Sequence, residues 1–225
     1  MRLFLNGGGD GEKCIQAYKK INKIIDHKKP ILYIPIAMEK EKYGDCEKWI
    51  KNELKDIEVP HIEMMTSGIE LSNKKLANYS ALFIGGGNTF KLLYELKSSG
   101  AIEKIKEFIN NNGVVFGGSA GAIIFGYDLE ACVCDDLNEI GLKDIKGFDV
   151  LNGYSLLCHY TNRNEEKIKS NTDYLLQLSY KRKSIALPEE DTIFINESEI
   201  DIIGDKDYYV FENGKFEKNR RISFR

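Results

Sequence analysis

Residues 117–121 read Gly-Gly-Ser-Ala-Gly, directly after the apolar run 113–116 and before an apolar segment that can begin a helix. A strand, the pattern G-x-S-x-G and a helix, in that order, form a nucleophile elbow, whose tight turn exposes a serine hydroxyl to a base. At a helix start, the backbone N–H of Ala120 is free to stabilise an oxyanion. The motif therefore predicts acyl transfer with Ser119 as nucleophile, although glycine and serine also cap helices.

A serine nucleophile requires a general base, and the chain has only three histidines. His27 lies in a charged run at a predicted helix end, and His61 begins a strand at the amino edge of the sheet. His159 stands near the end of the apolar run 154–160 and is followed by polar residues. A base must reach the serine, so we favour His159 and keep a half-buried structural histidine as the alternative.

A carboxylate must orient the imidazole, and two acidic pairs are available. Asp135 and Asp136 lie between the serine and the histidine, whereas Glu189 and Glu190 follow the apolar run 184–187. Spacing alone does not decide between these pairs.

A second glycine run, 85–87, follows the apolar residues 81–84 and precedes Asn88 and Thr89, either of which can cap a helix. Glycines allow a main-chain N–H to point into a site, so this run can supply the other oxyanion donor. Phosphate binding is the competing interpretation. The chain lacks both the Gly-Lys-Ser/Thr ending and the G-x-G-x-x-G spacing that such loops carry, which weakens it.

The elements that position these residues alternate between strand and helix patterns. Two segments repeat apolar residues at helical spacing, 12–26 and 41–55. The expected strands are 3–5, 31–36, 61–65, 81–84 and 113–116. This alternation predicts an α/β fold, a doubly wound and mostly parallel sheet with helices on both faces.

Ligands of such sheets bind beyond the carboxyl ends of the strands, where the glycine clusters at 7–11, 85–87 and 117–121 all fall. From Thr192 onward, short strands around the turn Asn213-Gly214 predict a C-terminal antiparallel β-hairpin tail. Without an internal repeat or linker, residues 1–225 are interpreted as one domain.

Composition limits the partners. The 225 residues are 42% hydrophobic and 30% charged, with a net charge of −3, so the chain has no basic surface for nucleic acid or for an anionic membrane. No apolar stretch is long enough for a membrane span or a signal peptide, so we expect a cytoplasmic protein.

The five cysteines of the chain show no CxxC pair, which favours reduced thiols and no metal site. The tail can cover a sheet edge or pair with a second copy, so a homo-oligomer stays open.

Five motifs in this order resemble the peptidase E family of serine peptidases, the aspartyl dipeptidases, with cyanophycinase as a more distant relative. They are Gly-Gly-Gly-Asn-Thr-Phe at 85–90, Gly-Ser-Ala-Gly-Ala at 118–122, Gly-Phe-Asp at 147–149, His-Tyr-Thr-Asn at 159–162 and Leu-Pro-Glu at 187–189. The resemblance implies a fold similar to class I glutamine amidotransferases (flavodoxin-like), with serine in place of their cysteine and no metal or organic cofactor.

The resemblance also implies roles for single residues. Ser119 corresponds to the family's nucleophile and His159 to its base, and Gly87 and Ala120 correspond to its oxyanion donors. The third member is assigned to an aspartate in the loop between the serine and the histidine. Asp136 is therefore preferred, Asp135 comes second, and Glu189 remains an alternative.

Family members release an amino-terminal aspartate from short peptides, which implies a basic residue that binds the substrate carboxylate. Arg163 and Lys167 occupy the stretch where the family is rich in arginine, and Arg163 and Asn88 are the expected substrate-binding residues. Two other functions remain open. One is a binding module without catalysis for a small molecule or nucleotide, and the other is a different amide or ester hydrolase.

Overall fold

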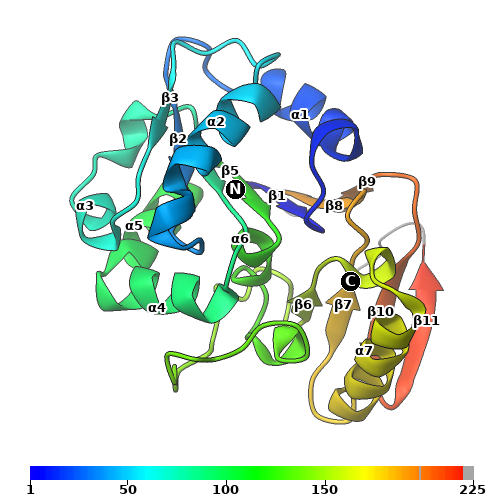
Figure 1. Ribbon diagram of the computed structural model, residues 1–225. Coiled ribbons are helices and arrows are strands. Elements are labelled where there is room, and N and C mark those ends of the chain that lie inside the picture. Colours follow the sequence, from blue (N-terminus) through cyan, green and yellow to red (C-terminus); the bar gives the residue numbers. More distant parts are fainter. Residues whose placement is uncertain (198, 220–225) are drawn as a thin grey trace.

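The computed structural model describes residues 1–197 and 199–219. Within this part of the chain, a seven-stranded sheet has the order β3-β2-β4-β5-β1-β8-β9 (Figure 1). The strands are β1 (Arg2–Asn6), β2 (Ile31–Ile34), β3 (Ile62–Met64), β4 (Ala81–Ile84), β5 (Val114–Gly118), β8 (Thr192–Asn196) and β9 (Glu199–Ile203). The five strands from β3 to β1 pair in parallel, and β8 and β9 extend the sheet in antiparallel pairing. The predicted mostly parallel sheet is confirmed.

Alternate residues of the strands enter two apolar layers, one on each face of the sheet. Phe83 of β4 packs with Tyr18 of α1 and Trp49 of α2, whereas Leu82 joins the cluster formed with α4, α5 and α6 on the other face. The helices are α1 (Ile15–Asn22), α2 (Tyr43–Glu53), α3 (Gly68–Ser72), α4 (Thr89–Ser98), α5 (Ala101–Asn110), α6 (Ala120–Ile123) and α7 (Glu165–Leu178). Short 3₁₀ turns are η1 (Gly11–Cys14), η2 (Lys40–Lys42), η3 (Leu76–Asn78), η4 (Glu130–Cys132) and η5 (Tyr160–Asn162). The doubly wound arrangement follows from strands that are apolar on both faces.

A second, four-stranded sheet has the order β11-β10-β7-β6 and lies beside α7 (Figure 1). Its strands are β6 (Ser155–Leu157), β7 (Ser184–Ala186), β10 (Tyr208–Glu212) and β11 (Lys215–Asn219). Asn213 and Gly214 both have positive φ, 53° and 73°, as a two-residue hairpin turn requires, so the predicted hairpin is confirmed.

The chain after Thr192 divides between two sheets, which was not expected from its sequence. β8 and β9 form one hairpin on the edge of the central sheet, while β10 and β11 form another that joins β7. Short apolar runs indicate strands, but they do not state which neighbour each strand pairs with.

The loops that follow the strands converge at one edge of the central sheet. A Cβ atom added to Gly8 would overlap the imidazole of His159, and one added to Gly86 would lie 3.2 Å from the Cβ of Ser119. The glycines after β1 and β4 thus admit the histidine and the serine, and this edge holds the candidate site.

Candidate active site

Ser119 occupies a sharp turn between β5 and α6. Its backbone angles, φ 52° and ψ −114°, are strained for a residue with a side chain. The carbonyl of Ser119 accepts hydrogen bonds from the N–H groups of Ala122 and Ile123, which hold the turn against the helix. A Cβ at Gly117 would overlap the carbonyl of Gly121, so the motif's glycines allow the close approach that the turn needs. The turn has the geometry predicted for a nucleophile elbow.

His159 lies just beyond β6, with its Nε2 2.8 Å from the Oγ of Ser119. Its backbone is left-handed, with φ 56° and ψ 20°, and its N–H donates to the carbonyl of Gly7 over 2.8 Å. Gly8, with φ 103°, lies against the imidazole, which leaves the ring little freedom to rotate away. The imidazole is therefore preorganised as the acceptor of the Ser119 proton.

Glu189, in the loop after β7, holds the other side of this imidazole. Its Oε1 lies 2.8 Å from the Nδ1 of His159, and its Oε2 forms an ion pair with Lys13 of η1. Two main-chain bonds fix the loop, because Glu189 N–H donates to Asn162 Oδ1 over 2.9 Å and the Glu189 carbonyl accepts from Gly9 N–H over 3.1 Å. The chain Ser119, His159, Glu189 has the connectivity of a serine hydrolase triad.

Glu189 is ionised at neutral pH. Burial raises the pKa of its carboxyl, but hydrogen bonds from Lys13 and His159 and their charges lower it more, so the pKa lies below its ordinary value. An ionised carboxylate accepts from Nδ1–H and leaves Nε2 as the basic nitrogen.

Asp136, the preferred third member from the sequence, is not beside the imidazole. Its Oδ2 accepts from the N–H of Thr89 over 2.9 Å and from the Thr89 hydroxyl, at the first turn of α4. The free N–H groups of a helix N-terminus attract a carboxylate, which explains this position. The structure therefore brings the alternative, Glu189, and not Asp136 to His159.

Asp135, the second choice, is also engaged elsewhere. Its carboxylate accepts from Arg163 over 3.2 Å, from Lys167 over 3.0 Å and from Asn171 over 3.1 Å. Burial raises its pKa, but hydrogen bonds from Lys167 and Asn171 and the charge of Arg163 lower it below the ordinary value. Asp135 thus anchors the start of α7 and two cations near the site.

The two expected oxyanion donors flank Ser119. Within the described residues, the N–H groups of Gly87 and Ala120 have no backbone acceptor, whereas the N–H of Asn88 donates to the carbonyl of Ala37. Gly87 has φ 132° and lies so close to Ala37 that a side chain would not fit. Two unengaged N–H groups next to the nucleophile are what an oxyanion hole requires.

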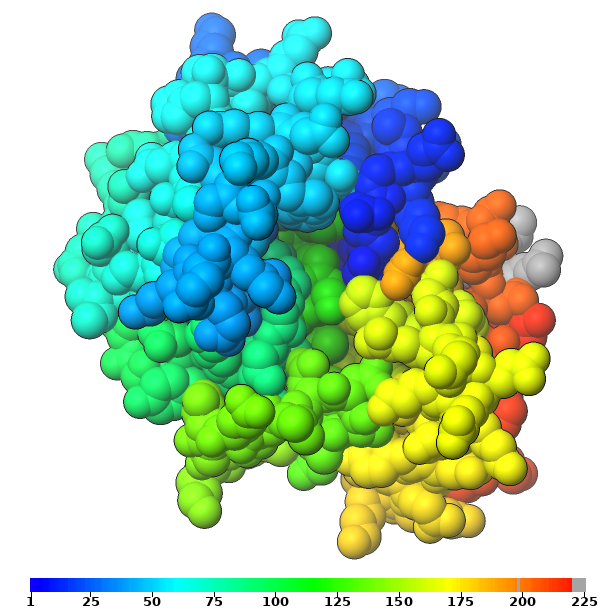
Figure 2. All heavy atoms as spheres, in the orientation of Figure 1, coloured from blue at the N-terminus to red at the C-terminus, as the bar shows by residue number. Residues whose placement is uncertain are grey.

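Two cavities adjoin Ser119, and both are bordered by Gly87 and His159. One of about 500 Å³ has five aromatic rings in its lining, and one of about 230 Å³ contains Arg163 together with Asp135. Figure 2 shows the hollow between the light blue segment around residues 35–45 and the yellow segment around 160–170. Ser119 thus borders two cavities whose linings differ in chemistry.

The two expected substrate-binding residues differ in their availability. Arg163 lines the polar cavity and is 40% exposed despite its bond to Asp135. Asn88 is occupied, since its Oδ1 accepts from Lys91 N–H over 2.9 Å and its Nδ2 donates to the Leu137 carbonyl over 2.8 Å. Its side chain caps α4 and lines neither cavity beside Ser119.

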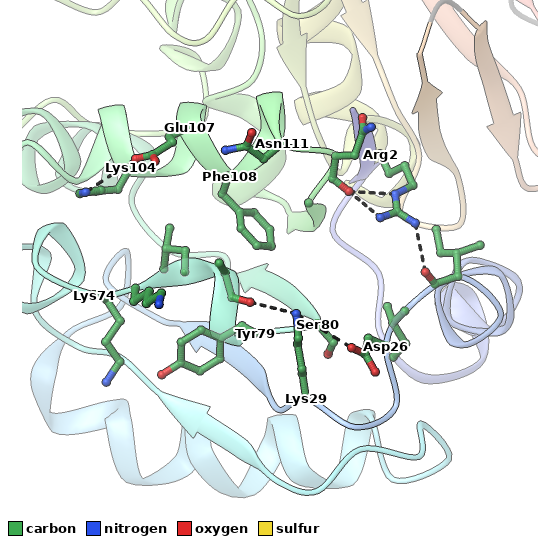
Figure 3. A pocket seen from close by; sticks show the side chains of 17 residues that line it. Arg2, Asp26, Lys29, Lys74, Tyr79, Ser80, Lys104, Glu107, Phe108 and Asn111 are labelled. Atoms are coloured by element: carbon green, nitrogen blue, oxygen red, sulfur yellow. Dashed lines mark hydrogen bonds and ion pairs between the residues drawn. The ribbon is translucent and has the colours of Figure 1, made fainter.

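A third cavity, of about 570 Å³, opens at the opposite, amino-terminal edge of the sheet (Figure 3). Several of its charged side chains are engaged by the backbone. Arg2 donates to the carbonyls of Asn112 and Ile24, and Lys29 donates to the carbonyl of Ala77. Size alone does not make it a catalytic site, because backbone carbonyls hold Arg2 and Lys29.

The cysteines offer no competing nucleophile. Cys158 precedes His159 and is 1% exposed, and burial raises its pKa well above the ordinary value. Burial also raises the pKa of Cys134, to about 12. Among the described residues, no group of three or more His, Cys, Asp and Glu side chains is arranged to hold a metal ion, and no helix is long and apolar enough to cross a membrane.

Lys13 and Asn162 were not expected at the site from the sequence, yet Lys13 binds the carboxylate of Glu189 and Asn162 binds its backbone N–H. Lys13 lies two residues after the first glycine cluster, at the edge where the site was expected, and this position was a usable signal. Asn162 belongs to the motif His-Tyr-Thr-Asn, but nothing in the spacing indicates that it binds the loop of Glu189.

Comparison with known proteins places this geometry in a class. The family model of peptidase family S51 matches residues 3–203. The chain is 28% identical over 197 residues to peptidase E of Nostoc sp. (strain PCC 7120 / SAG 25.82 / UTEX 2576), covering 83% of this chain and 77% of that protein. It is 29% identical over 147 residues to peptidase E of Escherichia coli (strain K12 / DH10B), covering 62% of each. This chain therefore belongs to peptidase family S51, and the predicted resemblance is confirmed.

Two solved structures share the fold. A protein from Listeria monocytogenes EGD-e that has been assigned to peptidase E superposes with a TM-score of 0.71 and 22% identity, covering 90% of this chain and 98% of that one. A peptidase from an acI-B1 Actinobacterium gives a TM-score of 0.75 and 16% identity, covering 99% and 96%. At these identities the likeness shows the α/β fold.

Proposed function

We propose that this chain hydrolyses short peptides through an acyl-enzyme on Ser119, with His159 as the base and Glu189 as the orienting acid. One observation carries the proposal. The imidazole of His159 lies 2.8 Å from the serine oxygen and 2.8 Å from a carboxylate oxygen, on opposite ring nitrogens. This arrangement makes a weak alcohol nucleophilic.

The reaction follows from these contacts. Ser119 Oγ attacks the scissile carbonyl while its proton passes to His159 Nε2, and Glu189 stabilises the imidazolium through Nδ1–H. The carbonyl oxygen becomes an oxyanion, which the N–H groups of Gly87 and Ala120 bind. His159 then protonates the leaving amine, and the acyl-enzyme remains. Water attacks it with the same base, which releases the amino-terminal residue and restores the hydroxyl.

We propose aspartate as that amino-terminal residue. The family resemblance supports it, and so does Arg163 in the polar cavity beside Ser119, where a guanidinium can bind a carboxylate. Asp135 already occupies part of this guanidinium, so the substrate shares Arg163 with it. The five free cysteines, four of them buried, support a cytoplasmic, reducing compartment.

The test is release of free aspartate from Asp-Leu by the purified chain, with Ser119→Ala as the comparison. We expect turnover from the original chain and a loss of about 10⁴-fold or more in the variant, because the nucleophile is gone. A serine-directed covalent probe should modify Ser119, and His159→Ala should stop that labelling. Equal background activity in both proteins, with no labelling, would contradict the proposal. A thermal shift with nucleotides in that case would favour the binding module.

A further inference from the structure

The larger cavity beside Ser119 has five aromatic rings in its lining and is called the aromatic pocket below. Its rings are those of Tyr18, Tyr33, Trp49, Phe83 and Phe116. They contact one another directly: Phe83 and Phe116 stack with centroids 4.3 Å apart, and Trp49 lies 6.4 Å from Phe83 in an edge arrangement. The rings therefore form one packed wall of the pocket, and they belong to the helices α1 and α2 and the strands β2, β4 and β5.

The pocket presents ring carbon to a ligand. Four of the five rings are nearly buried, and only Trp49, on the outer side, is 36% exposed. The hydroxyl of Tyr18 is used within the protein, since it donates to Glu53 over 2.8 Å. Charged residues line the pocket as well, but they are Asp10, Lys42 and Asp45, which lie in exposed parts of the chain. A side chain inserted among the rings gains from apolar burial, whereas a carboxylate there would lose its hydration.

The cavity on the other side of Ser119 has the opposite chemistry. It has less than half the volume, about 230 against 500 Å³, and it contains Arg163 and the carboxylates of Asp135 and Asp136. An amino-terminal aspartate carries an ammonium and a carboxylate, both of which need charged partners. The polar cavity supplies both kinds of partner beside Ser119, whereas Asp10, Lys42 and Asp45 of the aromatic pocket lie in exposed parts of the chain. The residue beyond the scissile bond would then extend toward the rings.

We infer that the aromatic pocket is the subsite for the second residue of the peptide, and that this enzyme prefers a large apolar residue there. The inference rests on the proposed function, because it takes Ser119 as the nucleophile and the polar cavity as the site of the first residue. Trp49 is the specificity residue with the greatest freedom to change, since it is the one partly exposed ring and its loss leaves the buried rings in place.

The experiment measures kcat/KM for Asp-Phe, Asp-Leu, Asp-Ala and Asp-Lys. We expect Asp-Phe and Asp-Leu to exceed Asp-Ala by about tenfold or more, as apolar pockets discriminate by side-chain size. Trp49→Ala should lower kcat/KM for Asp-Phe about tenfold, mainly through KM, and change Asp-Ala less than twofold. Trp49→Phe should restore most of the preference. Phe216→Ala, which removes a ring of similar exposure, 45%, from the second sheet, is the matched control and should leave the ratio unchanged.

The outcomes separate this inference from the proposed function. Equal rates for all four peptides, with Ser119 still required, would overturn the subsite and leave the peptidase intact. A preference for Phe-Leu over Asp-Leu would place the apolar side chain on the amino side of the scissile bond and overturn the assignment. Absence of hydrolysis and of Ser119 labelling would instead contradict the proposed function itself.

Discussion

The two edges of the central sheet are both hollowed, but their polar groups are organised differently. At the amino-terminal edge, Arg2 and Lys29 of the cavity of about 570 Å³ bind backbone carbonyls (Figure 3). At the carboxyl-terminal edge, Ser119 and His159 have positive φ. A series of contacts runs there from Lys13 through the Glu189 carboxylate and the His159 imidazole to the serine oxygen. The difference teaches that directed contacts, and not cavity volume, distinguish the edge proposed to carry the reaction.

The largest expected effect belongs to Glu189→Gln. An amide cannot stabilise the imidazolium as a carboxylate does, and it favours the wrong tautomer of His159, so we expect kcat to fall about 10⁴-fold, as in the triad template. Steady-state kinetics on Asp-Leu measure it. Asp136→Asn is the matched control and should cost less than about tenfold, because Asp136 binds Thr89. A larger loss of kcat for Asp136→Asn than for Glu189→Gln would instead indicate that Asp136 orients the imidazole.

Gly8→Ala is expected to come next. The new methyl would overlap the imidazole of His159, and φ 103° disfavours any side chain, so the ring must move from Ser119 and kcat should fall about 100-fold or more. Gly11→Ala has the same class of backbone, φ 53°, with open space around it, and it controls for strain alone. Circular dichroism verifies that both variants fold. Equal kcat in the two variants would show that the imidazole is not fixed by Gly8.

The edge that holds Ser119 also contains Asp191, just beyond Glu189, and burial of this carboxyl makes the free energy of unfolding depend on pH. Burial raises the pKa of this fully buried carboxyl to about 7, and its Oδ2 has no hydrogen-bond partner. The ordinary pKa, near 3.9, applies to the unfolded chain. The folded state therefore binds this proton more tightly than the unfolded chain does. The resulting stabilisation is fully present below the unfolded pKa and is lost as the pH rises through about 7.

We expect the free energy of unfolding to fall by roughly 2 to 3 kcal/mol between pH 5 and pH 8, and Asp191→Asn to remove most of this slope. Urea unfolding at several pH values measures it. Glu199→Gln alters an exposed acid of the same hairpin and should leave the slope in place. Parallel profiles for the Asp191 variant and the original chain would show that another group titrates.

At the opposite edge, Arg2→Met should affect stability and not catalysis. The guanidinium donates to the Asn112 carbonyl over 3.0 and 2.5 Å and to the Ile24 carbonyl over 3.1 Å, so its removal should cost about 1 to 2 kcal/mol. Thermal unfolding and kcat are measured together. Lys75→Met changes another cation of that cavity, one without an ion pair to the described residues, and should change neither quantity. A tenfold loss of kcat in the Arg2 variant would show that the amino-terminal edge also affects catalysis, which would contradict the contrast between the two edges.

Local patterns in the sequence predicted that Ser119 and His159 meet at the carboxyl-terminal edge of the sheet, and the structure brings them together there. The elbow around Ser119 requires glycines at fixed positions, and the scarcity of histidine left only His159 near a strand end. The third member could not be predicted in the same way. Whether Asp136 or Glu189 meets the imidazole depends on how β6 and β7 pair in the second sheet and on the helix N-terminus that binds Asp136, both of which are tertiary.

The smallest expected effect is that of Lys13→Met, and it tests how the carboxylate is held. Lys13 binds Glu189 Oε2 while His159 takes Oε1, so the cation can fix the carboxylate in place or weaken its pull on the imidazolium. Lys13 is 40% exposed, and exposed ion pairs contribute about 0.2 to 1 kcal/mol, so we expect kcat to fall no more than about fivefold. Lys13→Arg keeps the charge and should retain activity within about twofold. A rise in kcat for Lys13→Met would mean that the lysine mainly screens Glu189, and the positioning role would then belong to Asn162 and the main-chain bond from Gly9, which fix the same loop from its backbone.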